Sequence, residues 1–365
     1  MIDFIEKQEN KMLRVLTDLK KRNMPVVLFG ADLCGKNYMS VLKQYEIPVI
    51  AFVDDDKKKQ KAGYCGKTVL PTEELFTERY AEYPILISSF GPSRLMKRLE
   101  DLSKDLLKRV VWTEFYLWEK ELDYYEYYQS KEELIHKAYG LLSDEKSRKC
   151  FRNLLQYKIS RDRSLIREIQ DSPRLQYFDP NVITFGEREI FLDLGAYTGD
   201  TVNQFCNTVH GKYEKVYAVE PDEENYRRLQ VNTKQMKNIA CLKCGVASQD
   251  GVLRFSSDGT WTSAVDEMGN AEVEVKSVDN IVRETGVTYI KADIEGYEEE
   301  MLLGAHETIV RNYPQLAIAV YHKKKDIFTL INSIHELRDD YDYYLRHYTE
   351  LPIDSVLYAV RKDGS

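Results

Sequence analysis

The sequence predicts an α/β protein with two doubly wound, mostly parallel β-sheets, and three observations lead to this fold class. The chain has 365 residues, more than one hydrophobic core usually holds, so two domains are expected. Short apolar runs alternate with helical stretches in both halves, which is the βαβ order of parallel sheets. In each half an early apolar run ends in a glycine turn, at 30–35 and at 195–199.

Residues 1–118 are expected to form the smaller, Rossmann-like domain. Helical periodicity covers 5–19, and the strand at 25–30 enters the glycine turn before a helix through Leu42. A second strand runs over 49–56 and ends in Asp54. Apolar runs at 85–89 and 110–115 supply two more strands, which completes a small doubly wound sheet.

The turn of this domain departs from a dinucleotide fingerprint. Asp32 stands where the middle glycine belongs, which would place a carboxylate near any phosphate. We therefore expect a degenerate nucleotide-like fold that binds a substrate or partner, in preference to a working dinucleotide site. The charged run at 54–61 is interpreted as a solvated loop.

Residues 119–180 are predicted to be a helical connector. The aromatic run at 115–129 favours an amphipathic helix packed between domains, with a stacking platform for sugar rings as the alternative. Helix is expected to continue over 131–160. Its apolar face would consist of Leu134, Ala138, Leu141 and Leu142.

Composition excludes several classes of protein. Hydrophobic residues make up 43% of the chain and charged residues 31%, as in soluble globular proteins. A net charge of −8 argues against a nucleic-acid or anionic membrane surface. No apolar run is long enough to span a bilayer, and the N-terminus does not resemble a signal peptide. The lone Cys241-x-x-Cys244 lacks a second pair for zinc, so we expect reduced thiols and a cytoplasmic protein.

The main motif of the chain lies at 189–201, EIFLDLGAYTGDT, and is followed by VYAVEPD at 216–222. The first block reads as a buried strand that breaks into a glycine turn and opens a helix. Gly195 and Gly199 lack a Cβ, so the backbone is able to approach a ligand closely. Glu220 follows the second strand, where an acid accepts hydrogen bonds from ribose hydroxyls. Together these features predict a nucleoside site, in preference to a glycine turn without a ligand.

The spacing of the glycines decides which nucleoside is expected. A dinucleotide fingerprint would need glycines where this chain has Tyr197 and Asp200. Asp193 and Asp200 would also repel a diphosphate. They suit a ligand with a positive sulfonium and amino group, which describes S-adenosylmethionine.

The remaining strands indicate an acceptor site. The third strand and its exit turn are expected at 238–246, beside the adenine, followed by an inserted hairpin at 251–255 and 271–279. Its polar loop carries two candidate acceptor contacts, Trp261 and Ser263. Strands over 287–293 and 315–322 would place Asp293 and His322 at neighbouring carboxyl ends, which is where ligands bind in open α/β sheets.

Three blocks of the sequence resemble the FkbM-type methyltransferases: FLDLGAYTGDT with VYAVEPD, then YIKADIEGYEEEMLLGA, then LAIAVYHKKKDIF. The tail at 344–360 is similar too, so the resemblance covers 177–360. It implies a class I methyltransferase domain, which we expect at 181–365, with seven mostly parallel strands and an antiparallel sixth and seventh. It also implies S-adenosylmethionine-dependent methylation, most often of a hydroxyl on a sugar or a related secondary metabolite.

The resemblance further implies roles for individual residues. Asp193, Gly195 and Gly199 would hold the methionine end of the donor, and Glu220 its ribose. Asp293 and Glu295 fall in the family's motif beside the acceptor, whereas His322 and Asp326 fall in its YH-x-x-x-D block. The full expected donor site consists of Asp193, Gly195, Tyr197, Gly199, Asp200, Glu220, Pro221, Gly245, Val246 and Asp293.

Methyl transfer to a hydroxyl needs a proton acceptor, and His322 is assigned that role. Histidine titrates near neutral pH and is the commonest general base; Asp293 or Asp326 would orient it or bind the acceptor. The alternatives are a histidine that hydrogen-bonds the sheet end, or a divalent metal that holds a sugar diol through Asp293 and Glu295. For His347 a structural role is expected.

The sequence therefore predicts an enzyme that methylates oxygen on a glycan, sugar nucleotide or related metabolite, in polysaccharide biosynthesis. Its partner would be a small-molecule or glycan acceptor, with no nucleic acid and no membrane. One rival function is a nonenzymatic scaffold that binds S-adenosylmethionine. Another is an oxidoreductase or nucleotide-sugar-binding protein that acts through the N-terminal domain.

Overall fold

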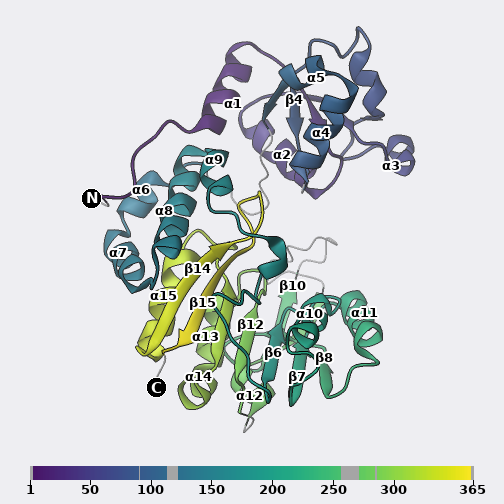
Figure 1. Ribbon diagram of the computed structural model, residues 1–365. Helices are drawn as coiled ribbons and strands as arrows, with labels where there is room; N and C mark the ends of the chain where they lie inside the picture. The colour runs from purple at the N-terminus through teal and green to yellow at the C-terminus, as the bar shows by residue number, and fades with distance from the viewer. Residues whose placement is uncertain (1–2, 90, 113–121, 256–270, 284–285, 363–365) are drawn as a thin grey trace. The chain divides into compact units, whose positions relative to one another are not determined.

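The computed structural model describes residues 3–89, 91–112, 122–255, 271–283 and 286–362. The chain divides into two compact units (Figure 1). The N-terminal unit contains 5–127 and 155–164, and the C-terminal unit contains 1–4, 128–154 and 165–365. Helix α8 (Glu145–Ser160) therefore contributes residues to both.

The N-terminal unit contains a five-stranded parallel sheet in the order β3-β2-β1-β4-β5. Successive residues of its central strand, β1, pack on opposite faces: Val26 and Leu28 enter one hydrophobic cluster, and Val27 and Phe29 enter another. A sheet buried on both faces is the expected form of a parallel α/β domain. The elements are α1 (Lys11–Lys21), β1 (Val26–Phe29), α2 (Leu33–Gln44), β2 (Val49–Val53), α3 (Lys57–Ala62), β3 (Val69–Leu70), η1 (Thr72–Phe76), β4 (Ile85–Ile87), α4 (Pro92–Leu102), α5 (Lys104–Lys108) and β5 (Val110–Trp112).

Two local predictions for this unit are wrong. The first helix begins at Lys11 rather than at residue 5, because the Asn10 side chain accepts a hydrogen bond from the Leu13 N–H and caps the helix there. The run at 54–61 is not simply a loop: α3 forms within it, and Asp56 caps the helix by accepting from the Lys58 N–H.

Short helices precede the larger sheet: α6 (Tyr125–Gln129), α7 (Glu132–Leu141), α8, α9 (Arg163–Arg167) and η2 (Pro173–Leu175). The single helix expected over 131–160 is interrupted between α7 and α8. Asp144 caps α8 by accepting from the Ser147 N–H, and the Ser143 N–H donates to the Tyr343 carbonyl. Of the aromatic run at 115–129, only 122–129 lies within the described residues.

The C-terminal unit contains a seven-stranded sheet in the order β14-β15-β13-β12-β6-β7-β8. Strands β6, β7, β8, β12 and β13 are mutually parallel, while β15 runs antiparallel to both of its neighbours. The predicted fold class is thus confirmed. The sheet strands are β6 (Ile190–Leu194), β7 (Lys215–Val219), β8 (Ile239–Leu242), β12 (Tyr289–Ala292), β13 (Gln315–Ala319), β14 (Tyr341–His347) and β15 (Ser355–Arg361).

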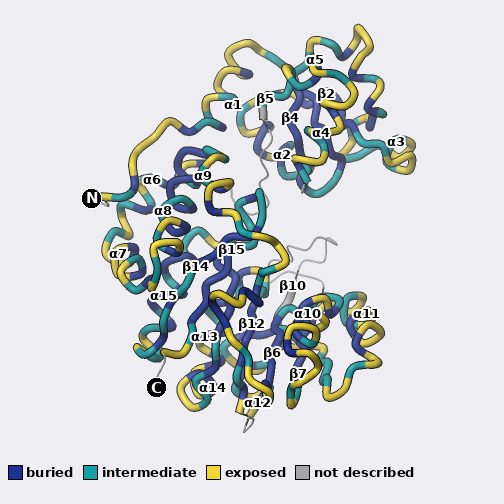
Figure 2. Tube along the Cα trace, in the orientation of Figure 1, coloured by how far each residue is buried: buried dark blue, intermediate teal, exposed yellow. Residues whose placement is uncertain are grey.

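Helices pack along both halves of this sheet, with α10 and α11 beside β6–β8 and α13–α15 beside β12–β15 (Figure 1). The strands are largely buried except the edge strand β8, which is half-buried, and the helices turn one face to solvent (Figure 2). At the core the rings of Phe191 and Tyr289 stack, with centroids 5.0 Å apart. The helices are α10 (Asp200–Thr208), α11 (Glu223–Thr233), α12 (Val278–Val282), α13 (Glu298–Gly304), α14 (His306–Asn312) and α15 (Asp326–Leu337).

A small second sheet, in the order β10-β11-β9, joins the predicted inserted hairpin to the chain that follows β8. Its strands are β9 (Gly245–Val246), β10 (Gly251–Phe255) and β11 (Ala271–Lys276). The run expected as one strand with its exit turn, 238–246, therefore serves two sheets. Within the described ranges, no helix combines the length and apolar character that crossing a bilayer requires.

Candidate active site

A cavity of about 740 Å³ opens in the C-terminal unit, where β6, β7 and β12 end. This is the position at which open α/β sheets bind ligands. Its wall includes most of the residues expected to hold the donor and acceptor. They are Gly195, Tyr197, Asp200, Glu220, Pro221, Gly245, Val246, Asp293 and Glu295.

Gly195 is required by contact between two strand ends. Its φ is +76°, and a Cβ there would lie 1.9 Å from the Asp293 carbonyl oxygen. Gly199 also has a positive φ, +87°, and forms the N-cap of α10. Gly199 is not among the described residues of the cavity wall. Its role is in the turn between β6 and α10, which Gly195 begins.

Asp193 lies beneath the cavity rather than in its wall. It is fully buried and accepts a hydrogen bond from the Thr201 hydroxyl, and its Oδ1 is 3.1 Å from Lys291 Nζ. Lys291 Nζ also donates to the carbonyl oxygens of Leu194 and Gly195. Burial alone would lower the pKa of Lys291, but the nearby carboxylates of Asp193 and Asp293 raise it. The ammonium therefore ties the ends of β6 and β12 together.

Glu220 lies at the end of β7 and is 6% exposed. One carboxylate oxygen accepts from the Tyr197 N–H at 2.9 Å, and the other accepts from the Asp222 N–H at 3.0 Å. Burial raises the pKa of Glu220 to about 7, although these two hydrogen bonds oppose the shift. The carboxylate is thus fixed in the cavity wall with lone pairs remaining for the two hydroxyls of a ribose.

Asp293 is held by two tyrosines at the end of β12. The Tyr177 hydroxyl donates to Oδ2 at 2.9 Å and the Tyr321 hydroxyl donates to Oδ1 at 3.0 Å. Burial and the Asp293 charge raise the pKa of both hydroxyls well above the usual value, so both tyrosines stay neutral donors. For Asp293, burial is outweighed by Lys291 and His322, and its pKa is lowered.

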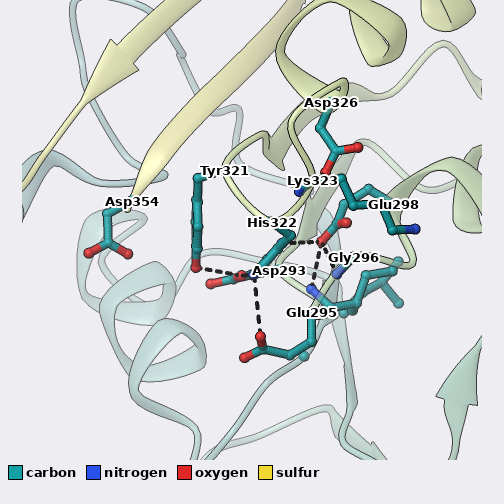
Figure 3. A network of polar contacts seen from close by, with 12 residues as sticks. Asp293, Glu295, Gly296, Glu298, Tyr321, His322, Lys323, Asp326 and Asp354 are labelled. Atoms are coloured by element: carbon teal, nitrogen blue, oxygen red, sulfur yellow. Dashed lines mark hydrogen bonds and ion pairs between the residues drawn. The ribbon is translucent and has the colours of Figure 1, made fainter. Parts of the chain in front are cut away.

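His322 follows β13 and lies among carboxylates (Figure 3). Its Nδ1 is 2.9 Å from Glu298 Oε1, and its Nε2 is 3.4 Å from Asp293 Oδ1 and 3.5 Å from Glu295 Oε2. Burial would lower the pKa of the imidazole, but these carboxylates raise it to about 10. His322 is therefore protonated at neutral pH.

Glu298 and Asp326 support the histidine from the first residues of α13 and α15. Glu298 is 1% exposed and accepts from the N–H groups of Ile294 and Gly296. Asp326 accepts from the Lys323 N–H, and burial together with the Glu298 charge raises the pKa of Asp326 to about 7.

Glu295 lies in the cavity wall and is the most exposed of the carboxylates that face His322. Its side chain is 44% exposed, against 4% for His322. Partial burial raises its pKa to about 7. The backbone of Glu295 has a φ of +57°, a conformation that costs a non-glycine residue free energy and is found disproportionately at functional sites.

Asp293, Glu298 and His322 each offer a ligand atom within 4.8 Å of the others, so the cluster could hold a metal ion. However, Glu298 faces Nδ1 of the imidazole and Asp293 faces Nε2. An ion bound there would have to displace a proton from the imidazole, because a protonated ring has no free lone pair.

The residues that complete this site had no assigned role at the sequence level. Lys291 and Glu298 lie in the YIKADIEGYEEEMLLGA block that resembles the family, so that block could have indicated them. Tyr321 is the first residue of the YH-x-x-x-D block, whereas Tyr177 had no signal of its own. Among the other candidates, His347 is fully buried and its Nδ1 is 2.8 Å from Ser355 Oγ; Trp261 and Ser263 lie outside the described residues.

The glycine turn of the N-terminal unit is occupied by its own carboxylates. Asp32 caps α2 by accepting from the N–H groups of Cys34 and Gly35. Asp54 accepts from the Ala31 N–H. These are the donors that a phosphate would need.

Comparison with known proteins gives a family for part of the chain. Residues 193–348 match the family described as methyltransferase FkbM domain. A crystal structure of methyltransferase FkbM from Methylobacillus flagellatus KT is similar, with a TM-score of 0.72 and 22% identity, covering 98% of this chain and 95% of that one. That likeness extends the shared fold to both units.

Other solved structures are less similar. Fibrillarin from Aeropyrum pernix, in complex with S-adenosyl-L-methionine, has a TM-score of 0.32 and 14% identity over 49% of this chain and 70% of its own. An rRNA methylase from Streptococcus thermophilus has a TM-score of 0.33 and 15% identity over 48% of this chain and 87% of its own. No curated protein matches the chain.

Proposed function

We propose that this chain, whose residues 193–348 match the methyltransferase FkbM domain family, is an S-adenosylmethionine-dependent methyltransferase that acts on a hydroxyl oxygen of a sugar in polysaccharide biosynthesis. One observation carries the proposal. A single cavity presents a fixed carboxylate, Glu220, in the wall that follows β7, and a cluster of carboxylates around Asp293 in the wall that follows β12. The first suits a donor ribose, and the second suits a polyhydroxylated acceptor.

The residues present fit the donor. Glu220 is oriented by backbone N–H groups on both oxygens, and the turn after β6 leaves Gly195 and Tyr197 in the wall for the methionine end. Gly245 and Val246 supply the wall where the adenine is expected. When bound, S-adenosylmethionine supplies an electrophilic methyl group on a sulfonium.

We assign the proton acceptor to Glu295 instead of His322. A protonated imidazolium with both nitrogens facing carboxylates does not accept a further proton. Glu295 reaches into the cavity, and a carboxylate with a pKa of about 7 is suited to remove a proton at neutral pH. Asp293, fixed by Tyr177 and Tyr321, would orient the acceptor hydroxyl.

His322 then acts as a positioning residue. Its positive charge lies between Glu298 on one side and Asp293 with Glu295 on the other. It therefore offsets the repulsion between these carboxylates and holds them in place at this end of the cavity.

Methyl transfer from labelled S-adenosylmethionine to a panel of sugars and oligosaccharides tests the proposal. We expect an O-methylated sugar, identified by NMR, and a loss of about 10²-fold or more in turnover for Glu295→Gln. Arg98→Lys, in the N-terminal unit, is the control. A product methylated on nitrogen or carbon would contradict the proposal.

For the N-terminal unit we propose substrate or partner binding. Asp32 and Asp54 already use the N–H groups of the turn, which favours this role over dinucleotide binding. Titration of the whole protein with NAD and with UDP-glucose tests it, because micromolar affinity for either would contradict an occupied turn.

We further propose that the protein works in the cytoplasm. The six cysteines are free thiols, which suits a reducing compartment. Acidic composition favours a small-molecule or glycan acceptor over nucleic acid or an anionic membrane.

A further inference from the structure

The acceptor end of the cavity is rich in carboxyl groups. Its wall contains Asp293, Glu295 and Asp354, and the buried Glu298 and Asp326 belong to the same polar cluster (Figure 3). The hydroxyls that contact Asp293 are neutral donors, so they orient its charge without cancelling it.

The lysine and arginine side chains of the described cavity wall are already engaged. Among the described residues of the wall, the lysine and arginine side chains are those of Lys291 and Arg228. The ammonium of Lys291 is 2% exposed and faces Asp193 and two carbonyl oxygens. Arg228 lies on α11 and pairs with Glu224 at 2.9 Å.

His322 supplies one positive charge against several carboxylates. Its side chain is 4% exposed, and its nitrogens face Glu298, Asp293 and Glu295. The carboxyl group of Asp354 has no described cation paired with it; its Oδ1 accepts from Gln176 Nε2 at 3.1 Å.

We infer that the acceptor is a polyol that carries a protonated amine near the reacting hydroxyl, such as an amino sugar with a free amino group, and that it carries no phosphate or carboxylate there. This inference rests on the proposed function and narrows its substrate. An ammonium would form ion pairs with Asp354 and Glu295, whereas a phosphate would meet carboxylates while Lys291 and Arg228 of the described wall are already paired. Nucleotide-linked sugars, which keep a diphosphate beside the ring, are disfavoured for the same reason.

Matched probes test this inference directly. The protein loaded with S-adenosylhomocysteine is titrated calorimetrically with glucosamine, N-acetylglucosamine and glucosamine 6-phosphate, and with the same three forms of galactosamine and mannosamine. We expect a free-amine form to bind at least about tenfold more tightly than its acetylated form, and the phosphate form to bind more weakly than the unphosphorylated amine.

Asp354→Asn is the informative variant. Asp354 has a φ of +61°, which asparagine adopts readily, so the substitution preserves the backbone and removes the charge. It should shrink the preference for the amine to about threefold or less, while Glu223→Gln, outside the cavity wall, leaves it unchanged.

Several results would overturn the inference. They are equal binding of amine and acetyl forms, tighter binding of a phosphate form, absence of amine binding in all three sugars, or a neutral diol that binds only with added Mn²⁺. The last result would show that the negative charge holds a metal. Methylation of a phosphorylated sugar would refute the inference and leave the proposed function standing, whereas absence of transfer to any sugar would refute the proposed function itself.

Discussion

The pH dependence of donor binding should follow the ionisation of Glu220. Burial raises the pKa of Glu220 from 4.5 to about 7. At a pH where Glu220 is ionised in both the folded and the unfolded protein, this shift lowers the free energy of unfolding by about 3 kcal/mol. Because the folded state holds this proton more tightly than the unfolded state, the Glu220 contribution to stability falls as pH rises from about 4.5 to about 7. Ribose hydroxyls would donate to the ionised form and recover part of that cost.

Affinity for S-adenosylhomocysteine should therefore rise by up to about tenfold per pH unit below pH 7 and level off above it. In Glu220→Gln the amide group offers one acceptor oxygen and does not titrate. We expect a loss of about 2 kcal/mol at pH 8, roughly thirtyfold in Kd, and a much flatter pH profile.

Calorimetric titration between pH 5.5 and 8.5 measures both quantities, and chemical denaturation of the unliganded proteins checks that each variant is folded. Glu223→Gln is the matched control, because Glu223 is an exposed carboxylate on α11 outside the cavity wall. A variant that retains the wild-type slope below pH 7 would show that another group titrates. A variant within threefold of wild type at pH 8 would remove Glu220 from the donor site.

Four further predictions concern the strand ends and the His322 cluster. Gly195→Ala should lower the free energy of unfolding in urea by about 2 kcal/mol or more, since its Cβ would lie 1.9 Å from the Asp293 carbonyl oxygen; an unchanged midpoint would contradict this packing. His322→Gln should reduce methyl transfer by at least about tenfold while Kd for S-adenosylhomocysteine stays within about threefold; undiminished turnover would remove the positioning role. Turnover should survive EDTA because the imidazole separates Glu298 from Asp293, and it should rise through about pH 7 as Glu295 deprotonates; dependence on added metal or a decline over that range would refute these expectations.

Much of the donor half of the site is visible in the sequence because its signals are local. A strand, a turn and a helix are contiguous in the chain, so Gly195 and Glu220 are found from spacing alone, and the structure places both in the cavity wall. The reason for the glycine is different from the expected one. Spacing suggested room for a ligand, whereas the structure shows contact with the backbone of β12.

The acceptor half depends on residues that are far apart in the chain. Tyr177 precedes the first strand of the sheet and Tyr321 follows β13, yet both donate to Asp293. Tyr177 belongs to no spaced pattern, and although Tyr321 opens the YH-x-x-x-D block, nothing in that block indicates a contact with Asp293. Only the packed sheet brings them together.

The sequence by itself determined the fold class and indicated which segments form strands and which motif would bind the donor, because periodicity and glycine spacing are properties of contiguous residues. It also placed Asp293 and His322 at neighbouring strand ends. Only the tertiary structure decided their chemistry. The protonation state of His322 follows from three carboxylates that converge on it from separate positions, and Asp193 proved to be a buried partner of Lys291. Charge and burial depend on which segments pack together, so the roles of these groups are properties of the folded chain.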